Sequence, residues 1–253
     1  MKFIQLLNLE YAMINQETSV GDIVKNHFQT VKIFDDHQID FCCGGKQSLG
    51  EACAKKSIDP NKIIAQLKEA IKIPVMVPKF DEMPLGELIQ YIKEKHHSYV
   101  REQIPMLSKF LNKIEQVHGG KHPEIEMINA HFKESAKNLS QHMEQEETEL
   151  FPLIENLVKI KNGESIDDSF ISINAKESIS SLIKDHENEG SRFEEISRLT
   201  LSYQPPKGAC NTFRAAYENL FAFEKDLHRH IHLENNILFP KAINLELDVK
   251  KNN

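Results

Sequence analysis

The sequence predicts an all-α protein, in which a small helical domain precedes an up-down-up-down four-helix bundle. The 253-residue chain carries four long stretches with the hydrophobic period of a helix, at about 85–118, 123–160, 169–201 and 209–245. The breaks between them, HGGKHP, KNGESID and SYQPPKG, are short and contain glycine or proline. Short connections make consecutive helices antiparallel neighbours, which is the connectivity of a bundle.

The residues before the bundle predict a separate small domain. Residues 1–17 form an N-terminal extension to which we assign no element, and residues 18–73 form the small helical domain. Thr18 or Ser19 caps a helix that runs to about Asp36. The loop DFCCGGKQS follows, then a short helix capped by Ser48 and a helix opened by Asp59-Pro60.

A proline-rich segment predicts the boundary between the domains. Residues 74–84 hold three prolines and are expected to form the linker, which leaves residues 85–253 for the bundle. Pro105, Pro152 and Pro240 fall within or near the ends of the long helices. We expect them to kink or stop these helices, because proline lacks the N–H of the helical hydrogen bond.

Charge and composition exclude several classes of protein. The net charge is −7 and the isoelectric point is near 6.0, so the chain lacks the basic field of a general binder of nucleic acid or anionic membranes. No apolar run reaches the length of a membrane span. The cysteines, at positions 42, 43, 53 and 210, form a poor disulfide framework. These features predict a cytoplasmic protein in a reducing compartment.

A repeated motif is the strongest chemical signal in the chain. Residues 142–152 read HMEQEETELFP and residues 230–240 read HIHLENNILFP, so each half places a glutamate four residues after a histidine. Residues four apart share one face of a helix. The motif extends upstream, because His97 precedes His142 by 45 residues and His186 precedes His230 by 44. We therefore expect one helical hairpin used twice around a central site.

The same helical periodicity predicts which side chains point inward. His142, Glu146, His186 and Glu234 lie within apolar stripes and His230 lies at the edge of one, whereas His228 and His232 fall outside. On the first long helix, periodicity favours His96 and the repeat spacing favours His97, so both stay open at this point. A buried histidine is commonly structural. Two buried carboxylates, however, are costly without a cation, so a site for two metals, iron or manganese, is the favoured interpretation.

The motifs together resemble a known family. DFCCGGKQSL, KHHSYVREQIP, LSQHMEQEETELFP, KDHENEG and HIHLENNILFP are similar to motifs of the repair-of-iron-centres family, cytoplasmic hemerythrin-like proteins with an N-terminal Cys-Cys-Gly-Gly domain. The resemblance covers about residues 18–243 and implies two iron ions in an oxo-bridged di-iron centre. It implies His97, four residues before Arg101, as the first-helix ligand. The implied ligand set is His97, His142, Glu146, His186, His230 and Glu234.

The resemblance also implies a function. Family members restore iron–sulfur clusters damaged by oxidative or nitrosative stress, by donating iron, by reducing nitric oxide at the di-iron centre, or both. The expected partners are nitric oxide or dioxygen as small ligands and iron–sulfur proteins as clients, with no nucleic acid or membrane, and a homodimer as the candidate oligomer. The alternatives are an oxygen or nitric-oxide sensor or carrier, and an iron-storage protein.

The adjacent cysteines are the second candidate site. For Cys42 and Cys43 the functional reading is a redox, nitrosyl-accepting or iron-handing pair, because thiolates bind soft metal species well. The alternative is a purely structural loop, in which one cysteine packs inward and the glycines shape the turn. The resemblance favours a catalytic role. Cys53, on a short helix, is expected in the core, and Cys210, after a Pro-Pro-Lys-Gly break, is expected to be structural.

Overall fold

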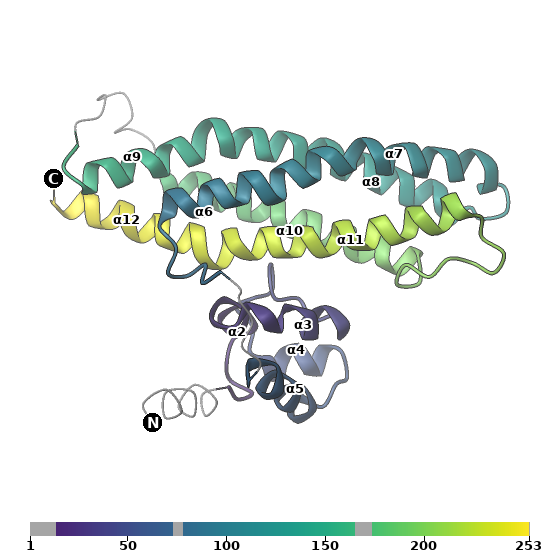
Figure 1. The fold of residues 1–253 in the computed structure, drawn as a ribbon, viewed down its shortest axis with the longest axis horizontal. Helices are drawn as coiled ribbons and strands as arrows, with labels where there is room; N and C mark the ends of the chain where they lie inside the picture. The colour runs from purple at the N-terminus through teal and green to yellow at the C-terminus, as the bar shows by residue number, and fades with distance from the viewer. Residues whose placement is uncertain (1–13, 73–77, 165–173, 253) are drawn as a thin grey trace. The chain divides into compact units, whose positions relative to one another are not determined.

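The computed structural model describes residues 14–72, 78–164 and 174–252, and the helices of this part are drawn in Figure 1. The chain divides into two compact units. One unit comprises Met1–Pro84 together with Ile231–Pro240, and the other comprises Leu85–His230 together with Lys241–Asn253. The described residues form no strand, and Ser19 and Ser48 share an isolated antiparallel β-bridge. The all-α fold class predicted from the sequence is confirmed.

The N-terminal helices largely follow the sequence prediction. They are α2 (Val20–Asn26), η1 (Phe28–Thr30), α3 (Val31–Asp36), α4 (Leu49–Lys55) and α5 (Pro60–Lys72). The single helix expected from Ser19 to Asp36 is wrong, because the chain leaves the helical region at His27 (φ −139°, ψ 69°) and passes through a 3-10 turn. The hydroxyl of Thr30 donates to the carbonyl oxygen of His27 at 2.6 Å. Such local side-chain bonds compete with a continuous helix.

Helix α4 begins with a complete capping box. The Ser48 hydroxyl accepts a hydrogen bond from the backbone N–H of Glu51, and the Glu51 carboxylate accepts one from the backbone N–H of Ser48. These bonds from Ser48 hold the pKa of Glu51 below its usual value. The cap satisfies amide donors that the first turn of a helix leaves without intrahelical partners.

We expect Ser48→Ala to lower the free energy of unfolding by about 1 kcal/mol, because an alanine N-cap cannot accept from the Glu51 amide. Urea denaturation followed by far-ultraviolet circular dichroism measures this change. Ser48→Thr, which keeps a hydroxyl at the cap, serves as the control and should lose much less. Equal losses in the two variants would show that the hydroxyl does not contribute.

The long helices of the sequence prediction are interrupted by π-helical segments. The first comprises α6 (Leu85–Tyr91), η2 (Ile92–His97) and α7 (Ser98–His118). The second comprises α8 (Glu124–Gln145), η3 (Glu146–Leu150) and α9 (Phe151–Lys161). The third is α10 (Ala175–Leu199), and the fourth comprises α11 (Asn211–Leu233), η5 (Glu234–Leu238) and α12 (Phe239–Asn252). The part of the third helix expected from residue 169 to 173 lies outside the described residues.

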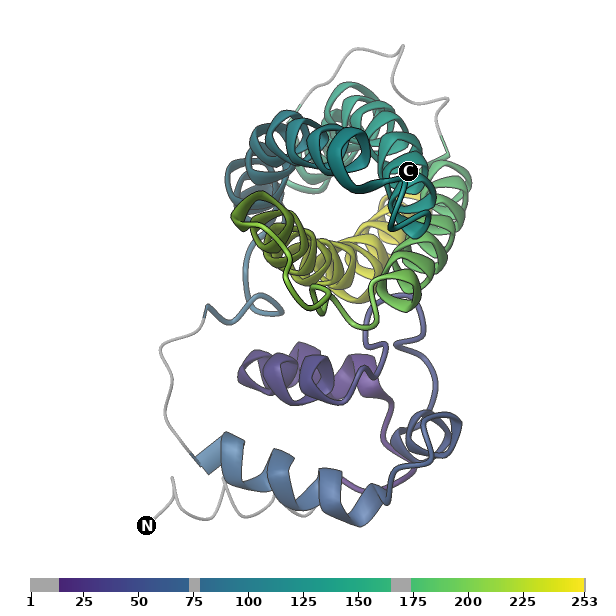
Figure 2. The same ribbon diagram turned by 90° about the vertical axis from the view of Figure 1, so that its right-hand side faces the viewer.

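These helices run side by side and bury one face each. Helix α8 packs against both α7 and α10, and α6 packs against α9. Figure 2 views them nearly end-on and shows a ring of helices. Aromatic side chains fill part of the centre, where Phe223 contacts Phe132 and Phe193 at centroid distances of 5.7 and 5.5 Å. None of the helices in the described part of the chain is both long enough and apolar enough for a membrane span.

Of the two outcomes expected at the prolines, a kink or a stop, the stop does not occur. Pro105 lies inside α7, and α9 and α12 continue past Pro152 and Pro240 to Lys161 and Asn252. Pro152 is the second residue of α9, directly after η3, and Pro240 stands in the same relation to η5. A proline at the start of a new α-helical turn loses no hydrogen bond that its N–H would have made. The π-helical segments η3 and η5 therefore let these two helices continue through Pro152 and Pro240.

Candidate metal centre

The structure brings the six predicted donors together in two groups. His97, Glu146, His230 and Glu234 offer ligand atoms that all lie within 4.8 Å of one another, and so do His142, Glu146, His186 and Glu234. Both groups contain Glu146 and Glu234. The arrangement is that of two adjacent metal positions, each with two imidazoles of its own and both served by the same two carboxylates.

The imidazole nitrogens are spaced as two ligands of one ion would be. The Nε2 atoms of His97 and His230 lie 3.1 Å apart, and those of His142 and His186 lie 2.9 Å apart. Two nitrogens that each lie about 2.1 Å from one ion, at a right angle, are about 3 Å apart. Nε2 of His97 and Nε2 of His142 each lie 3.4 Å from an oxygen of Glu146. The donor set therefore fits two metal ions with nitrogen and oxygen ligands.

Burial makes this donor set costly without cations. Glu146, Glu234 and His97 are 0% exposed, and His230, His186 and His142 are at most 6% exposed. An ionised carboxylate taken out of water loses a large hydration energy, which only nearby positive charge offsets. Two divalent ions among these side chains would supply that charge, whereas a structural zinc site would more commonly contain cysteine.

Three of the donors lie at the ends of π-helical segments. Segments η3 and η5 begin at Glu146 and Glu234, and η2 ends at His97. One extra residue in a helical turn shifts every following side chain around the axis, and π-segments of this kind are frequent at functional sites. On the first helix this shift explains why periodicity favoured His96 over His97. Both are buried, but only His97 belongs to a donor group.

Glu147, which lies outside the donor groups, orients His97. Nδ1 of His97 lies 2.6 Å from Oε1 of Glu147, whose carboxylate also accepts from Arg101 at 3.0 Å. Partial burial raises the pKa of Glu147, but the hydrogen bonds from Arg101 and His97 outweigh this effect and the pKa lies below its usual value. An ionised Glu147 keeps the proton of His97 on Nδ1, which leaves the Nε2 lone pair directed at the metal position.

Glu147→Gln should weaken metal binding about 10- to 100-fold while leaving the fold intact, because an amide holds the His97 tautomer less firmly than a carboxylate does. Competition with a chelator of known affinity measures the change. Glu149→Gln is the matched control, since it removes the same charge from an exposed position of the same π-helical segment. Equal affinities in the two variants would contradict a role for Glu147.

His96 forms a stacked pair with the donor His230. His96 stacks on His230 with an interplanar angle of 6° and a centroid distance of 5.5 Å, and its Nδ1 lies 3.0 Å from Oδ1 of Asp226. Sequence reasoning missed Asp226 and Glu147, because Asp226 lies outside the repeated motif and the position equivalent to Glu147 in the second copy is Asn235. Their signal is positional, since Glu147 directly follows a predicted ligand and Asp226 precedes His230 by one helical turn.

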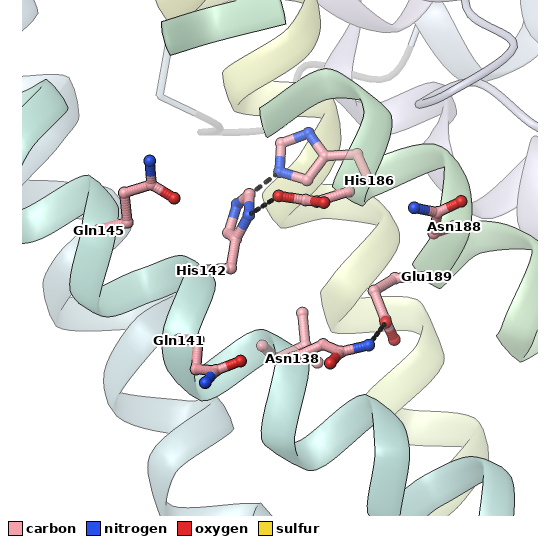
Figure 3. Close-up of a pocket in the computed structure, with 9 residues that line it drawn as sticks. Asn138, Gln141, His142, Gln145, His186, Asn188 and Glu189 are labelled. Carbon is pink, nitrogen blue, oxygen red and sulfur yellow. Dashed lines mark hydrogen bonds and ion pairs between the residues drawn. The ribbon is translucent and has the colours of Figure 1, made fainter. Parts of the chain in front are cut away.

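A polar cavity of about 280 Å³ lies beside the other metal position (Figure 3). His142 and His186 form part of its wall, together with Asp185, Asn138 and Glu189. Oδ2 of Asp185 lies 3.7 Å from Nδ1 of His142, and the Asp185 side chain is half exposed. Glu189 is buried and accepts hydrogen bonds from Asn138 and Ser135. The cavity brings solvent up to two of the six donors.

The remaining predicted residues lie elsewhere. Cys42 and Cys43 lie in the loop between α3 and α4, where their sulfur atoms are 3.8 Å apart and form no disulfide. Cys53 is buried, as predicted. Cys210 is exposed, with Sγ 3.3 Å from Nε2 of His118.

The prediction that His232 lies outside the buried stripe is wrong. This residue is 0% exposed, and burial lowers its pKa to about 4. It precedes η5 in the helix, and within its own unit Nδ1 lies 3.0 Å from the Asn236 side chain and 3.4 Å from the carbonyl oxygen of Phe41. Helical periodicity placed His232 outside because the stripe was defined only by the apolar residues of its own helix, and contacts with distant residues such as Phe41 did not enter.

Comparison with known proteins matches both parts of the chain. The model of a domain of unknown function, DUF542, matches residues 16–71, and the model of the hemerythrin HHE cation binding domain matches residues 89–242. The iron-sulfur cluster repair protein ScdA of Staphylococcus haemolyticus is 34% identical over 90% of this chain and 99% of its own length. The iron-sulfur cluster repair protein YtfE of Pectobacterium carotovorum is 37% identical over 91% and 99%, and YtfE of Yersinia pseudotuberculosis is 37% identical over 85% and 91%.

Proposed function

Because the chain belongs to the family of iron–sulfur cluster repair proteins with a hemerythrin HHE domain, we propose that it repairs iron–sulfur clusters damaged by oxidative or nitrosative stress. We propose further that its metal is iron, held as an oxo-bridged pair. The observation that supports this most is that Glu146 and Glu234 belong to both donor groups. Two shared carboxylates hold two ions close together, which a pair of separate sites would not do.

Each side chain has a distinct task in this proposal. His97 and His230 hold one ion, and His142 and His186 hold the other. Glu147 keeps the proton of His97 on Nδ1. The cavity beside His142 and His186 admits small polar molecules to that side of the centre. The six donors leave coordination positions open, as binding of a small ligand requires.

A bound iron pair would supply one-electron chemistry toward nitric oxide or dioxygen and a store of iron for damaged clusters. The proposed clients are therefore iron–sulfur proteins, and Cys42 and Cys43 are the proposed redox or iron-handing residues, because thiolates bind soft metal species. We propose that this takes place in the cytoplasm, in keeping with the absence of disulfides among the described cysteines.

Metal analysis of freshly purified protein, with an absorption spectrum, tests the iron proposal. We expect about two iron ions per chain and the charge-transfer bands of a ferric pair. Zinc or manganese in place of iron, or a single ion per chain, would contradict it.

Stopped-flow mixing of the reduced protein with nitric oxide separates the remaining functions. Production of nitrous oxide supports nitric oxide reduction, and stable, reversible binding supports the alternative of a sensor. If neither occurs, transfer of iron to an apo-form iron–sulfur protein is the expected activity, and failure of that transfer as well would contradict the repair role.

A further inference from the structure

Three donor side chains lie together in the loop between α3 and α4. Asp40, Cys42 and Cys43 offer one carboxylate oxygen and two sulfur atoms, all within 4.8 Å of one another. The loop belongs to the unit that contains Met1–Pro84. We propose that these three residues bind one thiophilic divalent cation, as a site separate from the six donors of the bundle. The inference deepens the role proposed for the cysteines and does not depend on the bundle metals.

The spacing of the sulfur atoms fits a shared ion. Sγ of Cys42 and Sγ of Cys43 lie 3.8 Å apart. Two thiolates bound tetrahedrally at about 2.3 Å from one ion are about 3.8 Å apart, whereas a disulfide would require about 2 Å. Oδ1 of Asp40 lies 3.2 Å from Sγ of Cys42. A metal that binds these atoms therefore needs little movement of the sulfurs, and water completes the fourth position.

The loop backbone holds these donors in place. Oδ1 of Asp40 accepts hydrogen bonds from the backbone N–H groups of Cys42 and Cys43 at 2.9 and 3.0 Å, and Oδ2 accepts one from Gly44 at 2.8 Å. A Cβ atom at Gly44 would lie 2.9 Å from Oδ2 of Asp40, and one at Gly45 would lie 2.8 Å from the carbonyl oxygen of Phe41. Only glycine allows this close approach. The Cys-Cys-Gly-Gly sequence thus fixes a preorganised donor set.

The charges of the site favour a cation. Cys42 is buried, Cys43 is partly exposed and Asp40 is exposed, so a cation can enter from solvent. The hydrogen bond with Cys43, burial, and the charges of Cys43 and Asp40 raise the pKa of Cys42 well above its ordinary value. Asp40 makes no ion pair with a lysine or arginine in the described part of the chain. A bound cation would replace the two thiol protons and attract the Asp40 carboxylate.

The binding step balances in protons. The divalent ion replaces the two thiol protons and forms two metal–sulfur bonds, so about two protons leave per ion bound. With Asp40 ionised throughout, the net charge of the site is unchanged, because the ion brings two positive charges and two protons leave. No oxidant or reductant takes part.

Titration of the full chain, with its bundle already loaded with iron, by Co²⁺ tests the proposal. We expect about one further Co²⁺ per chain, an absorption band from thiolate-to-cobalt charge transfer, and release of about two protons. Cys43→Ser should abolish the band or weaken binding at least about tenfold, since loss of an outer partner alone costs about 10- to 100-fold. Cys210→Ser is the control, because it removes an exposed thiol elsewhere and should leave the band unchanged.

A second measurement avoids any variant. In the wild-type protein, Zn²⁺ should slow alkylation of Cys43, the more accessible thiol of the pair, by about tenfold or more. The absence of a thiolate band in the wild type, a band that survives in Cys43→Ser with unchanged affinity, or unprotected alkylation would each overturn the proposal. Iron content and circular dichroism of the same samples report on the bundle, so loss of the bundle metals is distinguishable from loss of this site.

Discussion

Replacing both shared carboxylates by amides should empty the metal centre. In Glu146→Gln, Glu234→Gln protein we expect bound metal to fall from about two ions per chain to nearly none, and cluster-repair activity to fall with it. Each glutamate belongs to both donor groups, so the double change removes two charged ligands from each position. The remaining four imidazoles carry no charge to neutralise the ions, and amides bind divalent and trivalent metals far more weakly than carboxylates do.

Metal analysis of protein purified under identical conditions measures this loss. Glu144→Gln, Glu218→Gln is the matched control, because it makes the same two changes at exposed positions of α8 and α11. It should keep its metal. Circular dichroism confirms that both proteins remain helical. A double variant that retains two ions per chain would mean that the imidazoles alone hold them, and the assignment of Glu146 and Glu234 as ligands would fail.

The repeated motif predicted the donors well, because it depends only on residues that are close together in the sequence. A histidine and a glutamate four residues apart face the same way on any α-helix, so His142 with Glu146 and His230 with Glu234 could be paired without knowing the fold. The antiparallel order of the helices followed from short breaks. Together with the apolar stripes, these arguments predicted five donors and left His96 and His97 open, and the family resemblance selected His97. The structure brings the six donors together.

The failures of the sequence prediction come from departures from a regular helix. Periodicity at a constant angle per residue assumes an uninterrupted helix, but η2 contains His96 and His97 and changes the phase between them and α7. The same segments carry the chain past Pro152 and Pro240, where we expected a kink or an end. No residue type marks a π-segment, so its presence could not be read from the sequence. Asp226 and Glu147 were missed because their contacts depend on neighbouring helices.

Glu146 and Glu234 should destabilise the protein when metal is absent. In a chelator, the wild type should therefore be less stable than Glu146→Gln, Glu234→Gln protein. In a chelator, wild-type protein buries two carboxylates at 0% exposure without cations, whereas Glu146→Gln, Glu234→Gln protein buries neutral amides. Replacing buried charge by neutral groups is often stabilising, by about 1–4 kcal/mol. We therefore expect the metal-free variant to unfold at a higher urea concentration than the metal-free wild type.

With iron present under anaerobic conditions, we expect the wild type to be more stable than the variant. Ligand binding stabilises only the protein that binds, by about 2.7 kcal/mol at one hundred times the dissociation constant of a single site. The wild type gains this for each ion, and the variant gains nothing. Four urea titrations, each protein with chelator and with ferrous iron, measure the crossover. If the variant is the less stable protein in chelator as well, Glu146 and Glu234 stabilise the bundle through contacts with other residues. The buried carboxylates would then not need bound metal to offset their cost.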